Sequence, residues 1–216
     1  PGTTGDYWGF KLIQDPTNPN ILFAATSDGI YKTTDAGASW TQRQGGKFTD
    51  IEFKLGDHNV MYATQMSQNG AAISNAFYRS TNNGDNWTNT GITGIPTNTV
   101  RIAIGVSPNQ PGYVYLLAGP RTSSGSFAGV YISLNSGVDF VARANTPNIL
   151  GGATSGIDDR DQAWYDLAIE INPTNAANII TGGIDLWSST DRGGSFTNRT
   201  SWVQDITPAS KYVHAD

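Results

Sequence analysis

The acidic residues that recur along this chain stand in four copies of one eight-residue pattern, [S/T]-x-[D/N]-x-G-x-x-[W/F]. The copies are TTDAGASW at 33–40, STNNGDNW at 80–87, SLNSGVDF at 133–140 and STDRGGSF at 189–196. A repeated carboxylate could act as a general acid or as a ligand for a hard metal ion, and both roles depend on its charge or its proton. The third position, however, is Asp35 and Asp191 in two copies but Asn82 and Asn135 in the others. We therefore interpret all four side chains as caps that accept hydrogen bonds from backbone N–H groups of their own turn.

The glycine and the aromatic residue of each copy fit the same structural interpretation. Glycine adopts backbone conformations that other residues resist, and the aromatic ring is expected to return into the core between strands. The residues that we assign to structure are Asp35, Gly37, Trp40, Asn82, Gly84, Trp87, Asn135, Gly137, Phe140, Asp191, Gly193 and Phe196.

The pattern recurs within a longer frame of strand signals. The copies begin at residues 33, 80, 133 and 189, so they stand 47, 53 and 56 residues apart. Upstream of each copy lies a segment with period-two alternation, at 10–12, 51–55, 102–106 and 167–171. A turn rich in Asn, Pro or Gly follows, and then an apolar run at 21–25, 60–63, 114–118 and 179–181. A third strand leads into the copy and a short fourth strand leaves it. Four such strands make one propeller blade of roughly 40–50 residues.

The sequence therefore predicts an all-β fold, a β-propeller with four-stranded antiparallel blades. The four blades are expected at about 7–45, 46–92, 98–145 and 163–201, and residues 210–216 look like the start of another blade. From Trp8 to Phe196 the chain resembles the BNR/Asp-box family, which includes sialidases, xyloglucan-cleaving glycosidases, sortilin-type receptors and exported bacterial surface proteins. Propellers of that family usually have more than four blades. The resemblance implies that residues 1–216 form one partial propeller, whose partners include the remaining blades of a longer parent chain.

The resemblance also implies where a ligand would bind. In enzymes of this family the active site lies on the face opposite the motif hairpins, among the loops between the second and third strands and the links between blades. Asp28 and Asp185 lie in such loops, whereas Asp50 and Asp166 begin innermost strands. These four are the catalytic candidates, because a glycosidase needs two carboxylates about 5–10 Å apart. Arg101 shares the strand-start position and Arg121 lies in a long loop, so both are candidate ligand-binding residues.

The link before the fourth repeat is a second candidate for ligand binding. It reads GGATSGIDDRDQAWYD at 151–166 and contains Asp158, Asp159, Arg160, Asp161, Trp164 and Tyr165. Aromatic rings stack on sugar rings and carboxylates accept hydrogen bonds from hydroxyls, which favours glycan binding. Clustered Asp oxygens also suit calcium, although the spacing differs from an EF-hand loop. A solvated loop whose charges pair with one another is the third interpretation.

Composition excludes several other classes of function. The net charge is −5 and the chain has no basic run, so a nucleic-acid partner is not expected. The chain has no cysteine for disulfides or zinc thiolates, and no apolar run approaches the roughly 20 residues of a membrane helix. We expect no cofactor and no metal other than calcium.

Three hypotheses remain. The first is a secreted or cell-surface module that binds a glycan or a protein on the face opposite the motif hairpins. The second is a xyloglucanase-like glycoside hydrolase with paired Asp carboxylates, and the third is a scaffold propeller in a larger secreted assembly. A sialidase is disfavoured because Arg101 and Arg121 are too few to hold a substrate carboxylate.

Overall fold

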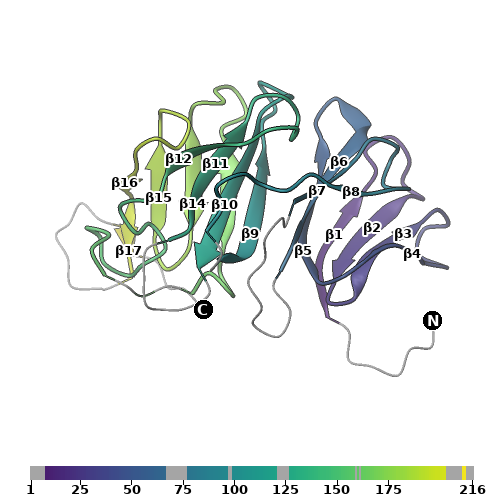
Figure 1. Ribbon diagram of the computed structural model, residues 1–216, viewed down its shortest axis with the longest axis horizontal. Helices are drawn as coiled ribbons and strands as arrows, with labels where there is room; N and C mark the ends of the chain where they lie inside the picture. Colours follow the sequence, from purple (N-terminus) through teal and green to yellow (C-terminus); the bar gives the residue numbers. More distant parts are fainter. Residues whose placement is uncertain are drawn as a thin grey trace.

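Four antiparallel sheets of four strands each make up the fold (Figure 1). The computed structural model describes residues 8–66, 77–96, 99–120, 127–158, 160 and 162–202, and the backbone of 211–212. These residues contain strands, turns and bends but no helix. In every sheet each strand pairs with the next one along the chain.

The sheets are numbered here as blades 1 to 4. Blade 1 has strands β1 (Gly9–Gln14), β2 (Leu22–Thr26), β3 (Gly29–Thr33) and β4 (Thr41–Gly45). Blade 2 has β5 (Phe48–Lys54), β6 (Asp57–Gln65), β7 (Phe77–Ser80) and β8 (Thr88–Asn89). Blade 3 has β9 (Thr99–Val106), β10 (Val114–Pro120), β11 (Gly129–Ser133) and β12 (Val141–Ala144). Blade 4 has β13 (Ala168–Ile171), β14 (Ile179–Gly182), β15 (Leu186–Ser189) and β16 (Thr197–Asn198), and β17 (Thr200–Ser201) pairs in parallel with β18 (Lys211–Tyr212).

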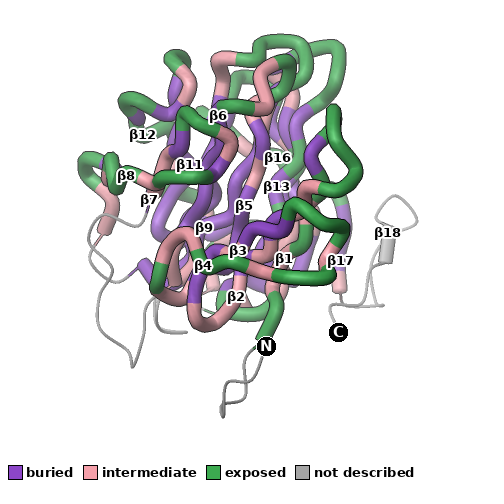
Figure 2. Tube along the Cα trace, turned by 90° about the vertical axis from the view of Figure 1, so that its right-hand side faces the viewer, coloured by how far each residue is buried: buried purple, intermediate pink, exposed green. Residues whose placement is uncertain are grey.

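The blades stack face to face as in a β-propeller. The first strands β1, β5, β9 and β13 lie side by side in that order. Buried residues follow the inner strands, whereas the turns and the outer strands β4, β8 and β12 are largely exposed (Figure 2). The all-β propeller predicted from the repeat is confirmed.

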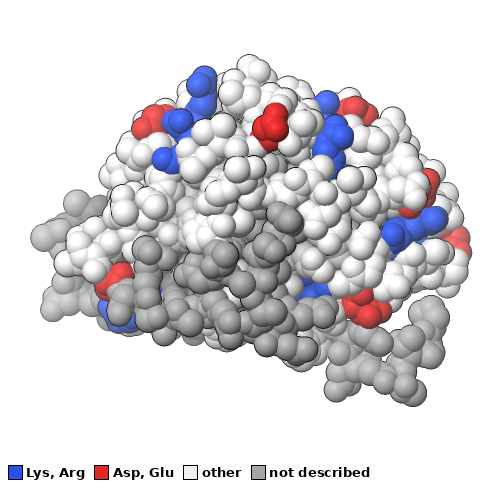
Figure 3. Space-filling model, viewed as in Figure 1, with Lys and Arg blue, Asp and Glu red and all other residues white. Residues whose placement is uncertain are grey.

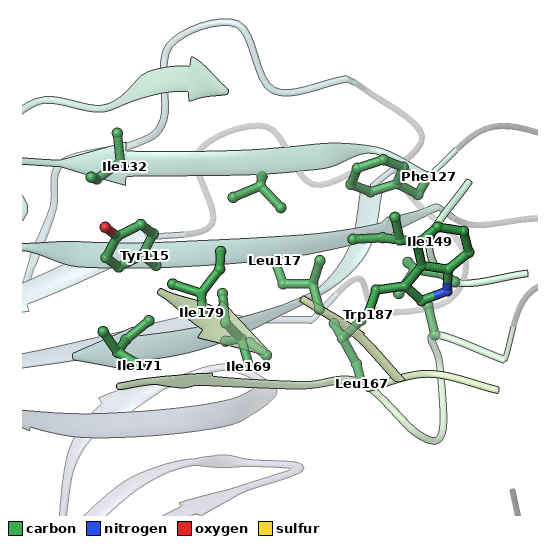
Figure 4. Packing of buried hydrophobic residues seen from close by; sticks show 14 residues of the cluster. Tyr115, Leu117, Phe127, Ile132, Ile149, Leu167, Ile169, Ile171, Ile179 and Trp187 are labelled. Atoms are coloured by element: carbon green, nitrogen blue, oxygen red, sulfur yellow. The ribbon is translucent and has the colours of Figure 1, made fainter. Parts of the chain in front are cut away.

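Apolar side chains from neighbouring blades form a core at each of the three blade junctions. One cluster joins blades 1 and 2 around Phe23, Phe48 and Met61, and another joins blades 2 and 3 around Tyr62 and Leu116. The third lies between blades 3 and 4, and Figure 4 shows Tyr115 and Leu117 facing Ile169, Ile171 and Ile179 there. Each blade is therefore held by its neighbour, as expected where no blade can bury its apolar surface alone.

The aromatic residue of the motif enters these cores to different depths. Phe140 is buried, whereas Trp40, Trp87 and Phe196 are only partly buried. Trp87 packs at the edge of the first junction and Phe196 at the edge of the third. The expectation that the rings return into the core is therefore met fully by Phe140 and in part by Trp87 and Phe196, whereas Trp40 belongs to none of the three clusters.

All four motif turns share one hydrogen-bond pattern. The third-position side chain accepts a bond from the backbone N–H four residues on, at 2.8 Å for Asp35, 3.0 Å for Asn82, 3.0 Å for Asn135 and 2.9 Å for Asp191. Asp and Asn therefore accept the same backbone hydrogen bond in the turn. The first-position hydroxyl, to which the sequence assigned no role, accepts a bond from the motif glycine and donates to the third-position side chain in every copy.

The backbone of each motif turn is left-handed at two successive residues. The fourth position has φ between 52° and 64° in Ala36, Asn83, Ser136 and Arg192, and the following glycine has φ between 69° and 93°. Two central residues with positive φ are typical of a type I′ turn, which suits the twist of a hairpin. The N–H of the fourth-position residue donates to a carbonyl just before the second strand of its own blade in blades 1, 3 and 4, and to the carbonyl of Asn59 near the start of β6 in blade 2.

Candidate binding face

The loops opposite the motif turns, here called the loop face, contain most of the candidate residues. The motif turns join third to fourth strands, so the second-to-third-strand loops and the links between blades lie at the other end of each sheet. Asp28, Asp185, the link at 145–167 and the starts of β5 and β9 belong to this face. Arg121, Asp159 and Asp161 lie outside the described residues.

Both carboxylate oxygens of Asp50 accept hydrogen bonds from other groups of the protein. Oδ1 accepts from Lys11 Nζ at 2.6 Å and from its neighbouring backbone N–H, and Oδ2 accepts from the backbone N–H of Ile104 at 2.7 Å. The side chain therefore ties β1, β5 and β9 together. A carboxylate with both oxygens engaged and only 8% of its surface exposed is poorly placed to attack or protonate a substrate.

A polar cavity of ≈ 210 Å³ lies among the four first strands, and we call it the central cavity. Its charged lining residues are Lys11, Asp50, Glu52, Arg101 and Glu170. Lys11 Nζ also contacts Glu52 Oε1 at 2.5 Å. Burial raises the pKa of Glu52, although Lys11 opposes the shift. Burial alone would lower the pKa of Lys11, but the two carboxylates outweigh it and raise that pKa.

Lys11 and Glu52 were not among the sequence candidates. They occupy the same position in the first and second repeats, two residues after Gly9 and Asp50. Opposite charges at one repeat position are a signal of an ion pair between neighbouring blades, and that signal could have found them.

The Arg101 guanidinium holds the backbone of the link at Trp164 and Tyr165. Its Nη1 donates to the carbonyl oxygens of Trp164 at 3.1 Å and Tyr165 at 2.7 Å. Burial lowers the pKa of Arg101, while the charges of Asp50 and Asp166 act in the opposite direction. The structure therefore brings three candidates together, with Asp50 and Asp166 near one guanidinium.

Trp164 and Tyr165 form an exposed aromatic pair on the loop face. Their relative exposures are 64% and 59%, and their ring centroids lie 5.5 Å apart at an interplanar angle of 48°. Two adjacent exposed rings with a fixed backbone offer a large apolar surface to a ligand.

The preceding part of the link is ordered by its own polar groups. Asp158 Oδ2 accepts from Arg160 Nε and from the backbone N–H of Gly152, both at 3.0 Å. The Asn148 amide donates to the carbonyls of Asp158 and Arg160, and the Arg160 guanidinium lies 5.6 Å from the Trp202 ring centroid. This arrangement matches the interpretation in which the charges of the loop pair with one another.

The two remaining acid candidates lie in different surroundings. Asp185 is fully buried and accepts from Thr200 Oγ1 at 3.4 Å. Burial raises the pKa of Asp185, and the nearby charge of Asp158 adds to that shift. Asp28 Oδ2 accepts from the Tyr31 hydroxyl at 2.6 Å and from Gln42. The four acids are therefore not gathered into one site: Asp50 and Asp166 flank Arg101, Asp185 lies near Asp158, and Asp28 bonds within blade 1.

Two other kinds of feature are absent from the described part of the chain. No three His, Cys, Asp or Glu side chains of the described residues are grouped to hold a metal ion. None of the described residues belongs to a helix long and apolar enough to span a membrane.

Solved structures with the same architecture identify the fold. An ancestral GH74 enzyme aligns with a TM-score of 0.64 and 18% identity, over 93% of this chain and 25% of the enzyme. The GH74 xyloglucanase from Xanthomonas campestris gives 0.60 and 14% identity, over 91% of this chain and 30% of that one. YCF48 from Cyanidioschyzon merolae gives 0.57 and 16% identity, over 94% and 59%. The fold is a β-propeller.

These likenesses extend to the fold alone, since all three identities lie below 20%. The chain spans 25% of the length of the ancestral enzyme and 30% of the length of the xyloglucanase. No protein-family model and no curated protein sequence matches the chain.

Proposed function

We propose that this chain is part of an exported β-propeller that binds a glycan on its loop face, with Trp164 and Tyr165 as the stacking platform. The observation that carries the proposal is the exposure of both rings on a backbone held by Arg101. A platform fixed before the ligand arrives loses little conformational entropy on binding.

The low charge of the chain as a whole suits an uncharged ligand. Charged residues make up 14% of the chain. On the side of the molecule seen in Figure 3, acidic and basic groups are few and mostly stand next to each other. Nothing in this charge pattern selects an anionic or cationic ligand, whereas a neutral sugar needs stacking surface and hydrogen-bonding groups. Low charge also fits an exported surface protein.

Neutral β-glucan and xyloglucan oligosaccharides are the first ligands to test, because one protein of similar fold is a xyloglucanase. Isothermal titration calorimetry with the 216-residue chain should detect binding to at least one of them. Trp164→Ala should weaken it by at least about tenfold, equivalent to about 1.4 kcal/mol. The variant should remain folded because the replaced ring is exposed.

A matched control is available in Trp8→Ala. Trp8 has the same exposure as Trp164, 64%, but belongs to blade 1. We expect this variant to bind as the parent chain does. Equal losses in both variants would mean non-specific adhesion to exposed indoles, and equal affinity of Trp164→Ala and the parent would reject the platform.

A glycoside hydrolase remains the second hypothesis, with a narrower set of acids. The contacts of Asp50 and the complete burial of Asp185 disfavour both as acid or nucleophile and leave the partly exposed Asp28 and Asp166 as the better candidates. Turnover of the same oligosaccharides that disappears in Asp28→Asn or Asp166→Asn, in folded protein, would favour the enzyme.

A further inference from the structure

The central cavity begins at the loop face and runs inward along the first strands. Phe10 and Thr49 are the second residues of β1 and β5, Arg101 is the third of β9, and all three line the cavity. Farther inward stand Lys11 and Glu52, whose side chains are 31% and 26% exposed. Solvent, and therefore a small ligand, reaches the charged groups of the cavity.

The cavity and the aromatic platform are neighbours. Arg101 lines the cavity, and its Nη1 donates to the carbonyl oxygens of Trp164 and Tyr165. Leu167, two residues after Tyr165, is also a lining residue. One guanidinium and one short stretch of chain therefore belong to both features, so a glycan on the platform lies beside the cavity.

The wall formed by blades 2 and 3 lies inside the repeat. Asp50 and Glu52 belong to β5, and Arg101 belongs to β9. Strand β5 lies between β1 and β9, and β9 lies between β5 and β13. Asp50 fixes this arrangement through its bonds to Lys11 and to the backbone of Ile104. The wall is therefore built by contacts between described blades, whichever further blades the propeller has.

This wall presents both free acceptors and free donors of hydrogen bonds. Glu52 Oε1 bonds to Lys11, whereas Oε2 accepts no hydrogen bond from any described residue. Arg101 uses Nη1 for the platform backbone, and within the described chain its Nε and Nη2 make no hydrogen bond. A sugar hydroxyl donates one hydrogen bond and accepts others, so neighbouring hydroxyls can bond to the carboxylate and to the guanidinium together.

Charge and size restrict what the cavity can hold. Three carboxylates face two cations, and Lys11 is already shared by Asp50 and Glu52. With no excess of positive charge, the wall does not favour the carboxylate of a sugar acid. The volume of ≈ 210 Å³ is also below the roughly 300–1,000 Å³ of sites that enclose drug-sized ligands. The cavity therefore suits one neutral sugar unit and excludes a chain of several.

We propose that the central cavity takes the terminal sugar unit of a neutral glycan, while the adjoining units lie on the platform. Glu52 accepts a hydrogen bond from this unit and Arg101 donates one to it. The inference rests on the proposed glycan binding, and it adds that the site recognises the ends of glycan chains and not their interiors.

The number of binding sites per gram of ligand tests for end recognition. Isothermal titration calorimetry is performed with a short oligosaccharide and with a long soluble chain of the same unbranched β-glucan. If only ends bind, the sites per gram fall in inverse proportion to chain length. Equal numbers of sites per gram for both ligands would overturn the proposal, because every stretch of the chain would then bind.

Two variants test the cavity itself with the short oligosaccharide. Glu52→Gln removes the free carboxylate and should weaken binding by at least about tenfold. Ala168→Met places a longer side chain in the cavity lining and keeps every charged group, so it should weaken binding similarly. Asp57→Asn is the matched control, because it removes one carboxylate from the same blade at the turn between β5 and β6. That variant should bind as the parent chain does, and circular dichroism checks that all three are folded.

The variants separate this proposal from the platform. Binding that Trp164→Ala weakens but Glu52→Gln and Ala168→Met leave unchanged would overturn the cavity and keep the platform. Binding that both cavity variants weaken but Trp164→Ala leaves unchanged would keep the cavity and reject the platform. A parent chain that binds neither β-glucan length would overturn end recognition of this glycan and the platform's first ligand together.

Discussion

Replacement of Gly84 by Ala tests whether the motif glycine serves its own turn or the junction between blades. Gly84 has φ +69° and Gly37 has φ +93°, so both substitutions force a β-carbon into the left-handed region. That strain costs about 1–2 kcal/mol. Only at Gly84 does the new carbon also overlap the Phe23 ring, and it lies 3.1 Å from Met61 Sδ.

The difference between the two variants isolates the cost of the contact between blades. Phe23 and Met61 are completely buried in the first junction, so neither can move away without disturbing the core. Overpacking of this kind costs about 1–3 kcal/mol. We therefore expect Gly84→Ala to lose about 2–5 kcal/mol of unfolding free energy and Gly37→Ala about 1–2 kcal/mol.

Urea unfolding followed by tryptophan fluorescence measures both losses, at a protein concentration where the chain is monomeric. With a slope of about 2 kcal/mol per molar urea, an excess of 2 kcal/mol moves the midpoint by about 1 M. Equal midpoints for the two variants would refute the reasoning, because the glycine would then be needed only for its turn.

Two charge substitutions probe the turn caps and the central cavity. Hydrogen bonds from Ser39 and Thr33 lower the pKa of Asp35 to about 2, against about 3.9 in an unfolded chain. Its stabilisation is therefore present above about pH 4 and lost as the pH falls through about 2. Asp35→Asn, which copies the second motif turn, should flatten the acid limb of urea midpoints measured from about pH 2 to about pH 7; an unchanged limb would contradict the assignment. Lys11→Met should cost about 1–3 kcal/mol at neutral pH, because it leaves two carboxylates without their cation. Since burial raises the pKa of Glu52, its protonation as the pH is lowered from neutrality should restore part of that loss, and equal losses at neutral and acidic pH would exclude this explanation.

The strand frame could be predicted from the sequence because the repeat is local and occurs four times. The alternating segments at 10–12, 51–55, 102–106 and 167–171 correspond to β1, β5, β9 and β13, and the apolar runs correspond to β2, β6, β10 and β14. The Asn residues in two motif copies correctly indicated a capping role. Both inferences depend on residues a few positions apart in the chain.

Apart from the ion pair of Lys11 and Glu52, whose opposite charges share one repeat position, the contacts between blades could not be predicted, because they join residues about 40–70 positions apart. The chain shows that Asp50 begins an inner strand, but its bond to the backbone of Ile104 exists only once β5 and β9 are side by side. The sequence predicts that Arg101 binds a ligand. In the structure its Nη1 instead donates hydrogen bonds to the carbonyl oxygens of Trp164 and Tyr165. The aromatic content of the link was visible in the sequence, but its exposure was not.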